Sequence, residues 1–158
     1  LNEHHVPVIW DMGQASAYVT ADDIEWFIEH IDILTLSAYE WDVLEEKTGL
    51  KQESVAARLQ ALIVTEGASG TTLYHNGQKK HYDALAIQGP AYPVGCGDAF
   101  RGGLLRALSL GWDWDDTMHL ASLMGAIKAQ CPQAQGYLRD KNEIARLYER
   151  AFGKAIIL

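Results

Sequence analysis

Short apolar runs and longer segments with helical spacing follow one another along the chain. The runs 6–10, 31–36 and 61–65 have the length and composition of buried strands. Between them, residues 20–30 place Ile24, Phe27 and Ile28 on one face of a predicted helix, and two more helices are expected over 37–49 and 52–59. Strands that alternate with helices predict an α/β fold, a mostly parallel sheet sandwiched by helices.

Polar residues at the segment ends predict where these helices begin and end. Ser37 and Glu40 have the Ser-x-x-Glu spacing of a capping box, and Gly49 is placed to close the same helix. Thr20 or Asp22 could cap the helix before it, because short oxygen-bearing side chains accept from the first free N–H groups. The caps therefore support the helices that the spacing predicts.

The rest of the chain reads as a hairpin followed by helices. Residues 71–75 and 80–86 predict two strands joined through an Asn-Gly turn at 76–77. Helices are expected over 95–110, from a cap at Asp115 or Asp116 to about residue 130, and over 140–152. No linker or internal repeat interrupts the 158 residues, which fit one domain or a piece of a larger one.

Composition narrows the classes of protein. Hydrophobic residues make up 48% and charged residues 22%, which is globular composition and argues against disorder. The formal net charge of −8 counts against nonspecific nucleic-acid binding, and no apolar run approaches the ~20 residues that span a membrane. Two cysteines, Cys96 and Cys131, are typical of reduced thiols and predict a cytoplasmic location.

The strongest chemical signal is residues 92–103, YPVGCGDAFRGG. Gly95 and Gly97 would let a ligand approach the backbone, and the helix that follows aims free N–H groups at it. A carboxylate at Asp98 would repel an anion held there, unless it takes a proton from a hydroxyl while the amides hold the charge on a phosphate. A tight turn in which Asp98 only caps the helix fits the same pattern.

Residues 92–105 resemble the signature of the ribokinase/PfkB family of carbohydrate and nucleoside kinases, in particular the adenosine-kinase-like branch, whose motif is similar to DPTGCGDAFRxGLL. Four more segments resemble family motifs in the right order: 11–14 (DMGQ), 37–40 (SAYE), 65–70 (TEGASG), and 125–128 (GAIK) followed by Gln135. Five ordered matches argue against chance similarity.

The resemblance implies a phosphoryl-transfer site at the turn. Asp98 would be the catalytic base that deprotonates the acceptor hydroxyl. The backbone amides of Gly95, Cys96 and Gly97 would form an anion hole for the transferring γ-phosphoryl group. Such a reaction needs positioning and charge stabilisation more than covalent chemistry.

The resemblance also implies sites for ATP and Mg²⁺. Thr65, Gly67 and Gly70 would line the ATP site, and Ser122 would lie near the adenine. Glu40 would organise Mg²⁺ through its water shell. The acceptor would be a small molecule, an adenosine-like nucleoside or a sugar.

Several positions depart from the family pattern. Tyr92 and Val94 stand where the family has Asp and Thr, residues associated with a monovalent-cation site, so potassium activation is doubtful. Ser37, Met12 and Gln133 replace Asn, Pro and Gly of other motifs. These changes keep a second hypothesis open, a nucleotide-binding module that has lost catalysis. A third is an unrelated α/β phosphate binder whose motifs match by coincidence.

The resemblance begins in the middle of the family's fold. Residues 1–158 are therefore expected to be the C-terminal, ATP-binding part of a single kinase domain, without the N-terminal half and its small β lid, and inactive on their own. A homodimer of the full-length form is also consistent with the resemblance.

Overall fold

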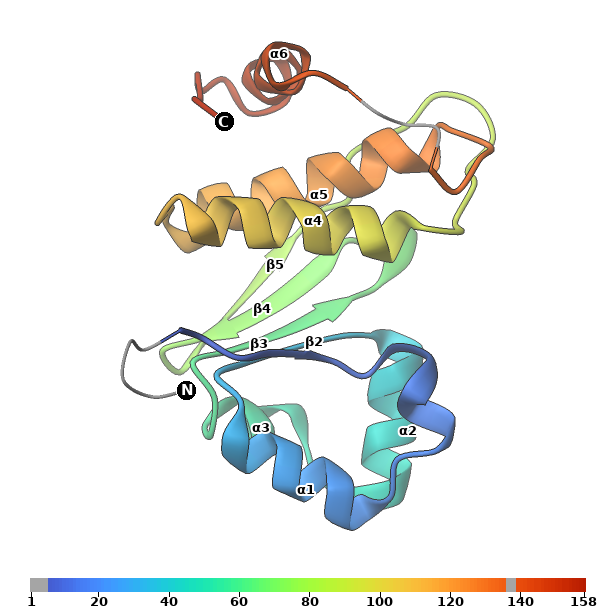
Figure 1. The fold of residues 1–158 in the computed structure, drawn as a ribbon, viewed down its shortest axis with the longest axis vertical. Helices are drawn as coiled ribbons and strands as arrows, with labels where there is room; N and C mark the ends of the chain where they lie inside the picture. The colour runs from blue at the N-terminus through green and yellow to red at the C-terminus, as the bar shows by residue number, and fades with distance from the viewer. Residues whose placement is uncertain (1–5, 136–138) are drawn as a thin grey trace. The chain divides into compact units, whose positions relative to one another are not determined.

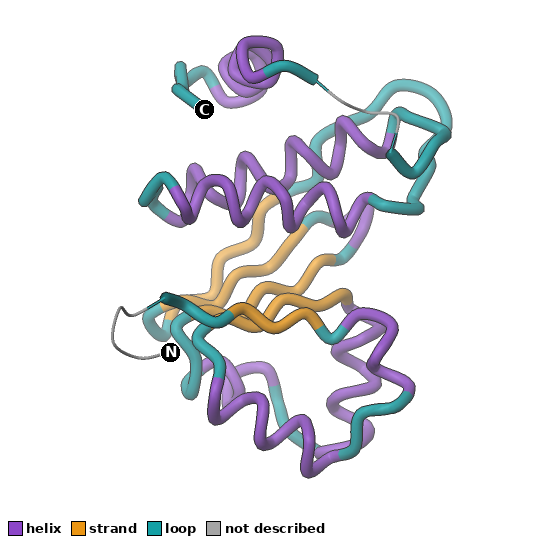
Figure 2. The backbone as a smooth tube through the Cα atoms, in the orientation of Figure 1, coloured by secondary structure: helices purple, strands orange, loops and turns teal. Residues whose placement is uncertain are grey.

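The computed structural model describes residues 6–135 and 139–158, in two compact units. The sheet unit, Leu1–Asp83, holds all five strands, drawn in orange in Figure 2. The helical unit, Ala84–Leu158, contributes three helices in its described part. No helix among the described residues is both long and apolar enough to cross a membrane.

The strands of the sheet unit lie in the order in which they follow along the chain (Figure 1). β1 (Ile9–Asp11), β2 (Ile33–Ser37) and β3 (Ala61–Thr65) pair in parallel. β4 (Thr71–His75) and β5 (Gln78–Tyr82) extend the sheet as an antiparallel hairpin. The α/β class is confirmed, with parallel pairing confined to the first three strands.

Helices α1 (Ala21–His30), α2 (Ala38–Thr48) and α3 (Gln52–Ala56) lie on one face of this sheet (Figure 1). The side chains that meet there are apolar and buried: Ile24, Ile28, Leu34, Leu36, Trp41, Leu44, Val55, Leu62 and Val64. Ile33 and Ile63, which point to the opposite face, are also buried. Burial on both faces explains why the strands read as continuous apolar runs rather than as alternating ones.

The predicted caps of the sheet unit are largely confirmed. Thr20, not Asp22, caps α1, in a capping box with Asp23. Ser37 caps α2, and Gly49 ends it in the left-handed conformation at φ 72°. These local signals hold because each cap is formed by residues three or four positions apart in the sequence.

Strand ends differ from the prediction where pairing decides them. β1 begins at Ile9 rather than at residue 6, because Ile9 is the first residue with a partner on β2, Ile33. β5 ends at Tyr82 rather than at residue 86, because its partner strand begins at Thr71. The helix expected over 52–59 ends at Ala56.

In the helical unit, α4 (Cys96–Ser109) and α5 (Trp114–Ala129) pack closely. A Cβ atom on Gly103 would lie 2.8 Å from both the Cα of Ala121 and the carbonyl oxygen of Leu120, so only glycine allows this approach. α6 (Lys141–Phe152) completes a core with Ala107, Leu120, Leu123, Ile127 and Tyr148.

The predicted cap of α5 was wrong by two or three positions. Asp113 caps it, accepting a hydrogen bond from the amide of Asp116 at 2.8 Å. The carboxylate of Asp116 instead accepts from the hydroxyl of Tyr148 at 2.8 Å and pairs with Lys154. Those partners lie far along the chain, so local spacing could not distinguish the neighbouring aspartates.

Candidate functional site

Three predicted motifs of the sheet unit follow parallel strands at the same edge. Asp11 is the last residue of β1, Ser37 of β2 and Thr65 of β3, and Ser37 pairs with Thr65 in register. Parallel strands end on one side of a sheet, where ligands of α/β proteins usually bind. The sheet unit thus brings the segment with Glu40 and the loop after Thr65 to one edge.

Glu40 is half-buried in the first turn of α2, where it forms a capping box. Its Oε2 accepts from the amide of Ser37 at 2.6 Å, while the Ser37 hydroxyl accepts from the amide of Glu40 at 3.3 Å. Across residues 6–135 and 139–158, no three His, Cys, Asp or Glu side chains lie close enough to ligate a metal ion together. Within this described part of the chain, the hydrogen bonds of the Glu40 carboxylate use Oε2 alone, so its second oxygen lies outside the capping box.

The loop between Thr65 and Gly70 closes on itself. The amide of Glu66 donates to the carbonyl of Gly70 at 2.8 Å, and the amide of Gly70 donates to the carbonyl of Gly67 at 3.2 Å. Gly67 adopts φ 60°, and Gly70 adopts φ 106° with ψ −142°, a region that side chains other than hydrogen disfavour. The glycines of this predicted ATP loop are thus required by its backbone.

His81, a residue that sequence reasoning did not single out, fastens this loop to β5. Its Nε2 lies 2.9 Å from the carbonyl oxygen of Ser69, which can only accept, so this nitrogen donates. Its Nδ1 lies 3.1 Å from the hydroxyl of Thr72, the residue opposite His81 in the ladder. The only sequence signal was the hairpin register, which places residues 72 and 81 side by side.

In the helical unit, the predicted catalytic turn opens α4. Gly95 precedes the helix at φ 86°, and a Cβ atom there would lie 3.0 Å from the carbonyl oxygen of Ala134. The amide of Cys96 donates to the carbonyl of Pro93 at 3.0 Å. The amides of Gly97 and Asp98 have no acceptor within the described part of the chain, as expected for the first turn of a helix.

The carboxylate of Asp98 belongs to the same helical turn and is 76% exposed. Nη2 of Arg101, one helical turn later, donates to its Oδ1 at 2.5 Å. A Cβ atom on Gly97 would lie 3.3 Å from Nη1 of Arg101, so glycine at this position leaves room for the guanidinium. The turn therefore presents free N–H groups and an ion-paired carboxylate together.

A buried lysine lies behind the turn. Lys128 of α5 is fully buried, and its Nζ donates to the carbonyl of Cys131 at 2.9 Å and to that of Tyr92 at 3.2 Å. The thiol of Cys96 donates to the same Tyr92 carbonyl at 3.3 Å. Burial raises the pKa of the Cys96 thiol, and the charge of Lys128 partly opposes this.

Ser122, predicted to lie near an adenine, is partly buried on α5, nearly two turns before Lys128. Its hydroxyl has no hydrogen-bond partner within residues 6–135 and 139–158. The structure thus places Ser122 with the α4 turn in the helical unit, and it places Glu40 and the Thr65–Gly70 loop in the sheet unit.

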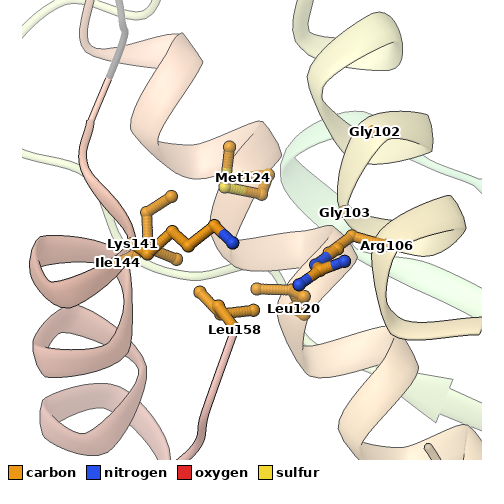
Figure 3. Close-up of a pocket in the computed structure, with 8 residues that line it drawn as sticks. All are labelled: Gly102, Gly103, Arg106, Leu120, Met124, Lys141, Ile144 and Leu158. Carbon is orange, nitrogen blue, oxygen red and sulfur yellow. The ribbon is translucent and has the colours of Figure 1, made fainter. Parts of the chain in front are cut away.

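A cavity of about 200 Å³ lies elsewhere in the helical unit (Figure 3). Leu120, Ile144 and Leu158 line it, and the charged ends of Arg106 and Lys141 point toward the same space. None of the predicted site residues lines this cavity.

Comparison with known proteins identifies the relatives of this chain. The model of the pfkB family of carbohydrate kinases matches residues 2–141. A nucleoside kinase of Methanocaldococcus jannaschii is 27% identical over 122 residues, 77% of this chain and 39% of that protein. A nucleoside kinase of Thermoplasma acidophilum is 35% identical over 101 residues, 64% of this chain and 33% of that protein.

A solved structure gives the same result for the fold. The nucleoside kinase of Burkholderia thailandensis, in complex with ADP-inosine, superimposes with a TM-score of 0.92 at 37% identity. The match covers 96% of this chain and 48% of that kinase. The chain therefore spans less than half the length of these relatives.

Proposed function

Because this chain belongs to the pfkB family of carbohydrate kinases, we propose that it forms the ATP-binding and catalytic part of a kinase that phosphorylates a hydroxyl group of a nucleoside or sugar. A nucleoside is favoured, because the relatives that this chain matches include nucleoside kinases. The other half of such a kinase would supply most contacts to the acceptor.

The transfer step would take place at the N-terminus of α4. The carboxylate of Asp98 accepts the proton of the acceptor hydroxyl, whose oxygen forms a bond to the γ-phosphorus as the bond to the β-phosphate oxygen breaks and ADP leaves. The free amides of Gly97 and Asp98 hold the charge on the transferring group. Cys96 would join this anion hole only by exchanging its hydrogen bond to Pro93.

The sheet unit would hold the nucleotide. The loop Thr65–Gly70 is closed by hydrogen bonds within it, so it can present an edge to ATP at the end of β3. In the helical unit, Ser122 is the residue proposed to contribute near the adenine. Glu40 keeps one carboxylate oxygen outside its capping box, and this oxygen would orient the water shell of Mg²⁺. When bound, the ion would neutralise charge on the phosphate oxygens.

One observation carries this proposal: an exposed carboxylate and two free amides in the same helical turn. A turn with only a capping role would use its carboxylate to accept from its own amides. Here no side-chain cap occupies the N-terminus of α4, and Asp98 pairs with Arg101 instead.

The test is release of ADP by the longest natural form of the protein, with Mg-ATP and a panel of nucleosides and sugars. We expect release that requires one acceptor and that falls about 10²- to 10⁴-fold in Asp98→Asn, because a positioned base contributes on that order. The neutral variant should still bind ATP. Equal rates in Asp98→Asn and wild type would exclude Asp98 as the base.

A second candidate is a nucleotide-binding module without transfer activity. It is favoured by Tyr92, which stands where the family has an Asp and so removes a side-chain carboxylate before the turn. This candidate predicts that the full-length form binds ATP but releases no ADP with any acceptor, and that Asp98→Asn changes nothing.

A further inference from the structure

Lys128 is the one charged residue that is fully buried among residues 6–135 and 139–158. A buried ammonium is costly unless hydrogen bonds replace its water. No carboxylate bonds to it within this described part of the chain, and its acceptors are the carbonyls of Tyr92 and Cys131. A side chain with a long apolar stem normally extends its charge to solvent, so this inward position calls for an explanation.

The two carbonyls belong to the segments on either side of the catalytic turn. Tyr92 starts the segment that leads into α4, and its amide donates to the carbonyl of Ala129 at 2.9 Å. Cys131 follows the end of α5. The ammonium therefore joins the beginning of the turn to the end of the neighbouring helix at one point.

The turn before α4 also packs against the side chain of Lys128. The Cε of Lys128 lies 3.3 Å from where a Cβ atom on Gly95 would stand, and the thiol of Cys96 shares the Tyr92 carbonyl with the ammonium. A displacement of Lys128 would thus be transmitted to Gly95 and Cys96, the residues immediately before the free amides.

We propose that Lys128 is a positioning residue for phosphoryl transfer, whose ammonium serves as a resident cation beneath the turn and makes an added monovalent cation unnecessary there. The proposal rests on the proposed function. Carbonyl oxygens that point toward one place can bind either an ammonium group or a potassium ion there. Two such cations a few ångströms apart would repel each other strongly in a buried setting, so the lysine excludes the ion.

The activity test uses the longest natural form and compares Lys128→Met with wild type. We expect kcat to fall roughly 10- to 100-fold, because a small misplacement of reacting groups costs up to about 10²-fold, while KM for ATP stays within about 2-fold. Wild-type kcat should not change when choline replaces potassium. Added ammonium or potassium ions should restore part of kcat in Lys128→Met, and Lys128→Arg, which keeps the charge, should retain more activity.

A second readout does not depend on kinase activity. In a Cys131→Ser background, alkylation of Cys96 as a function of pH reports the pKa of its thiol. Removing the charge in Lys128→Met should raise this pKa, whereas Lys128→Arg should leave it closer to wild type. If wild type releases no ADP, the proposed function fails. A Cys96 pKa that is higher in Lys128→Met than in wild type would still place the charge of Lys128 at the turn.

Lys47 provides the matched control. Its Nζ also binds backbone carbonyls, those of Ser16 at 2.8 Å and Val19 at 2.6 Å, but in the sheet unit. Lys47→Met should lower the midpoint of thermal unfolding without changing kcat, its response to cations, or the Cys96 pKa. The proposal is overturned if Lys128→Met folds and behaves like Lys47→Met in these three measurements, or if wild-type kcat requires potassium.

Discussion

The two glycine-containing turns of this chain are held in place by different contacts. In the loop Thr65–Gly70 of the sheet unit, the amides of Glu66, Ser69 and Gly70 bond to carbonyls inside the loop, and His81 of β5 anchors it. The amides of Gly67 and Ala68 have no acceptor within the described part of the chain. The turn before α4 leaves the amides of Gly97 and Asp98 open and is supported from behind by Lys128. Both turns therefore offer free donors, but only the second begins a long helix and carries an exposed carboxylate.

Because of this difference, we expect the two turns to have different functions. The loop Thr65–Gly70 closes on a 3₁₀ turn of three residues, so its two free amides lack the dipole of a long helix. An open helix N-terminus keeps donors and a favourable dipole for a negative group. We therefore expect changes in the first turn to act on nucleotide affinity and changes in the second to act on the rate of transfer.

Gly95→Ala should produce the largest effect of the substitutions that probe this contrast. The left-handed backbone costs alanine about 1–2 kcal/mol, and its Cβ atom would press on the Ala134 carbonyl and on Lys128. Because the turn must shift, we expect kcat to fall roughly 10- to 100-fold with little change in KM for ATP. Steady-state kinetics of ADP release measure both.

Gly111→Ala is the control for backbone strain alone. Gly111 follows α4 at φ 69°, but a Cβ atom there would meet nothing within 4 Å. It should lose a similar stability, about 1–2 kcal/mol by chemical denaturation, with kcat unchanged. An equal loss of kcat in both variants would contradict a specific role for the shape of the Gly95 turn.

How far the sequence predicts this fold depends on how local each determinant is. Capping by Ser37 and Glu40 and the Asn-Gly hairpin turn were predictable, because a few neighbouring residues decide them. The ends of β1 and β5 were not, since a partner strand elsewhere in the chain limits each ladder.

The same limit applies to the candidate site. The Gly-x-Gly-Asp pattern located the turn and its carboxylate, and the structure adds that the amide of Cys96 is already bonded to Pro93. The support from Lys128 depends on the approach of α5 to residue 92, a contact over 36 positions that no local pattern encodes.

Gly70→Ala should have an intermediate effect, confined to the nucleotide. At φ 106° and ψ −142° an alanine is strained by about 1–3 kcal/mol, and the bond from Glu66 to the Gly70 carbonyl would be disturbed. We expect ATP affinity to fall about 5-fold, equivalent to roughly 1 kcal/mol, with kcat at saturating ATP nearly unchanged. Isothermal titration gives the affinity directly.

Gly77→Ala is its matched control, since Gly77 has φ 72° in the β4–β5 turn with open space around it. Loss of stability without loss of ATP affinity is expected for Gly77→Ala. If instead kcat falls in Gly70→Ala while affinity is kept, the division of work between the two turns is wrong.

The smallest effect is expected for His81→Ala, which leaves the loop's internal hydrogen bonds intact and removes only its external fastening. The variant loses contacts of 2.9 Å to Ser69 and 3.1 Å to Thr72, so the loop should become more mobile and ATP affinity should fall about 2-fold, a few tenths of a kcal/mol. His75→Ala is the matched control, because His75 contacts the carbonyl of Gln60 at 2.7 Å, at the other end of β4. A shift in affinity that is equal in both variants would mean that general weakening of the sheet, rather than anchorage of the loop, sets nucleotide binding.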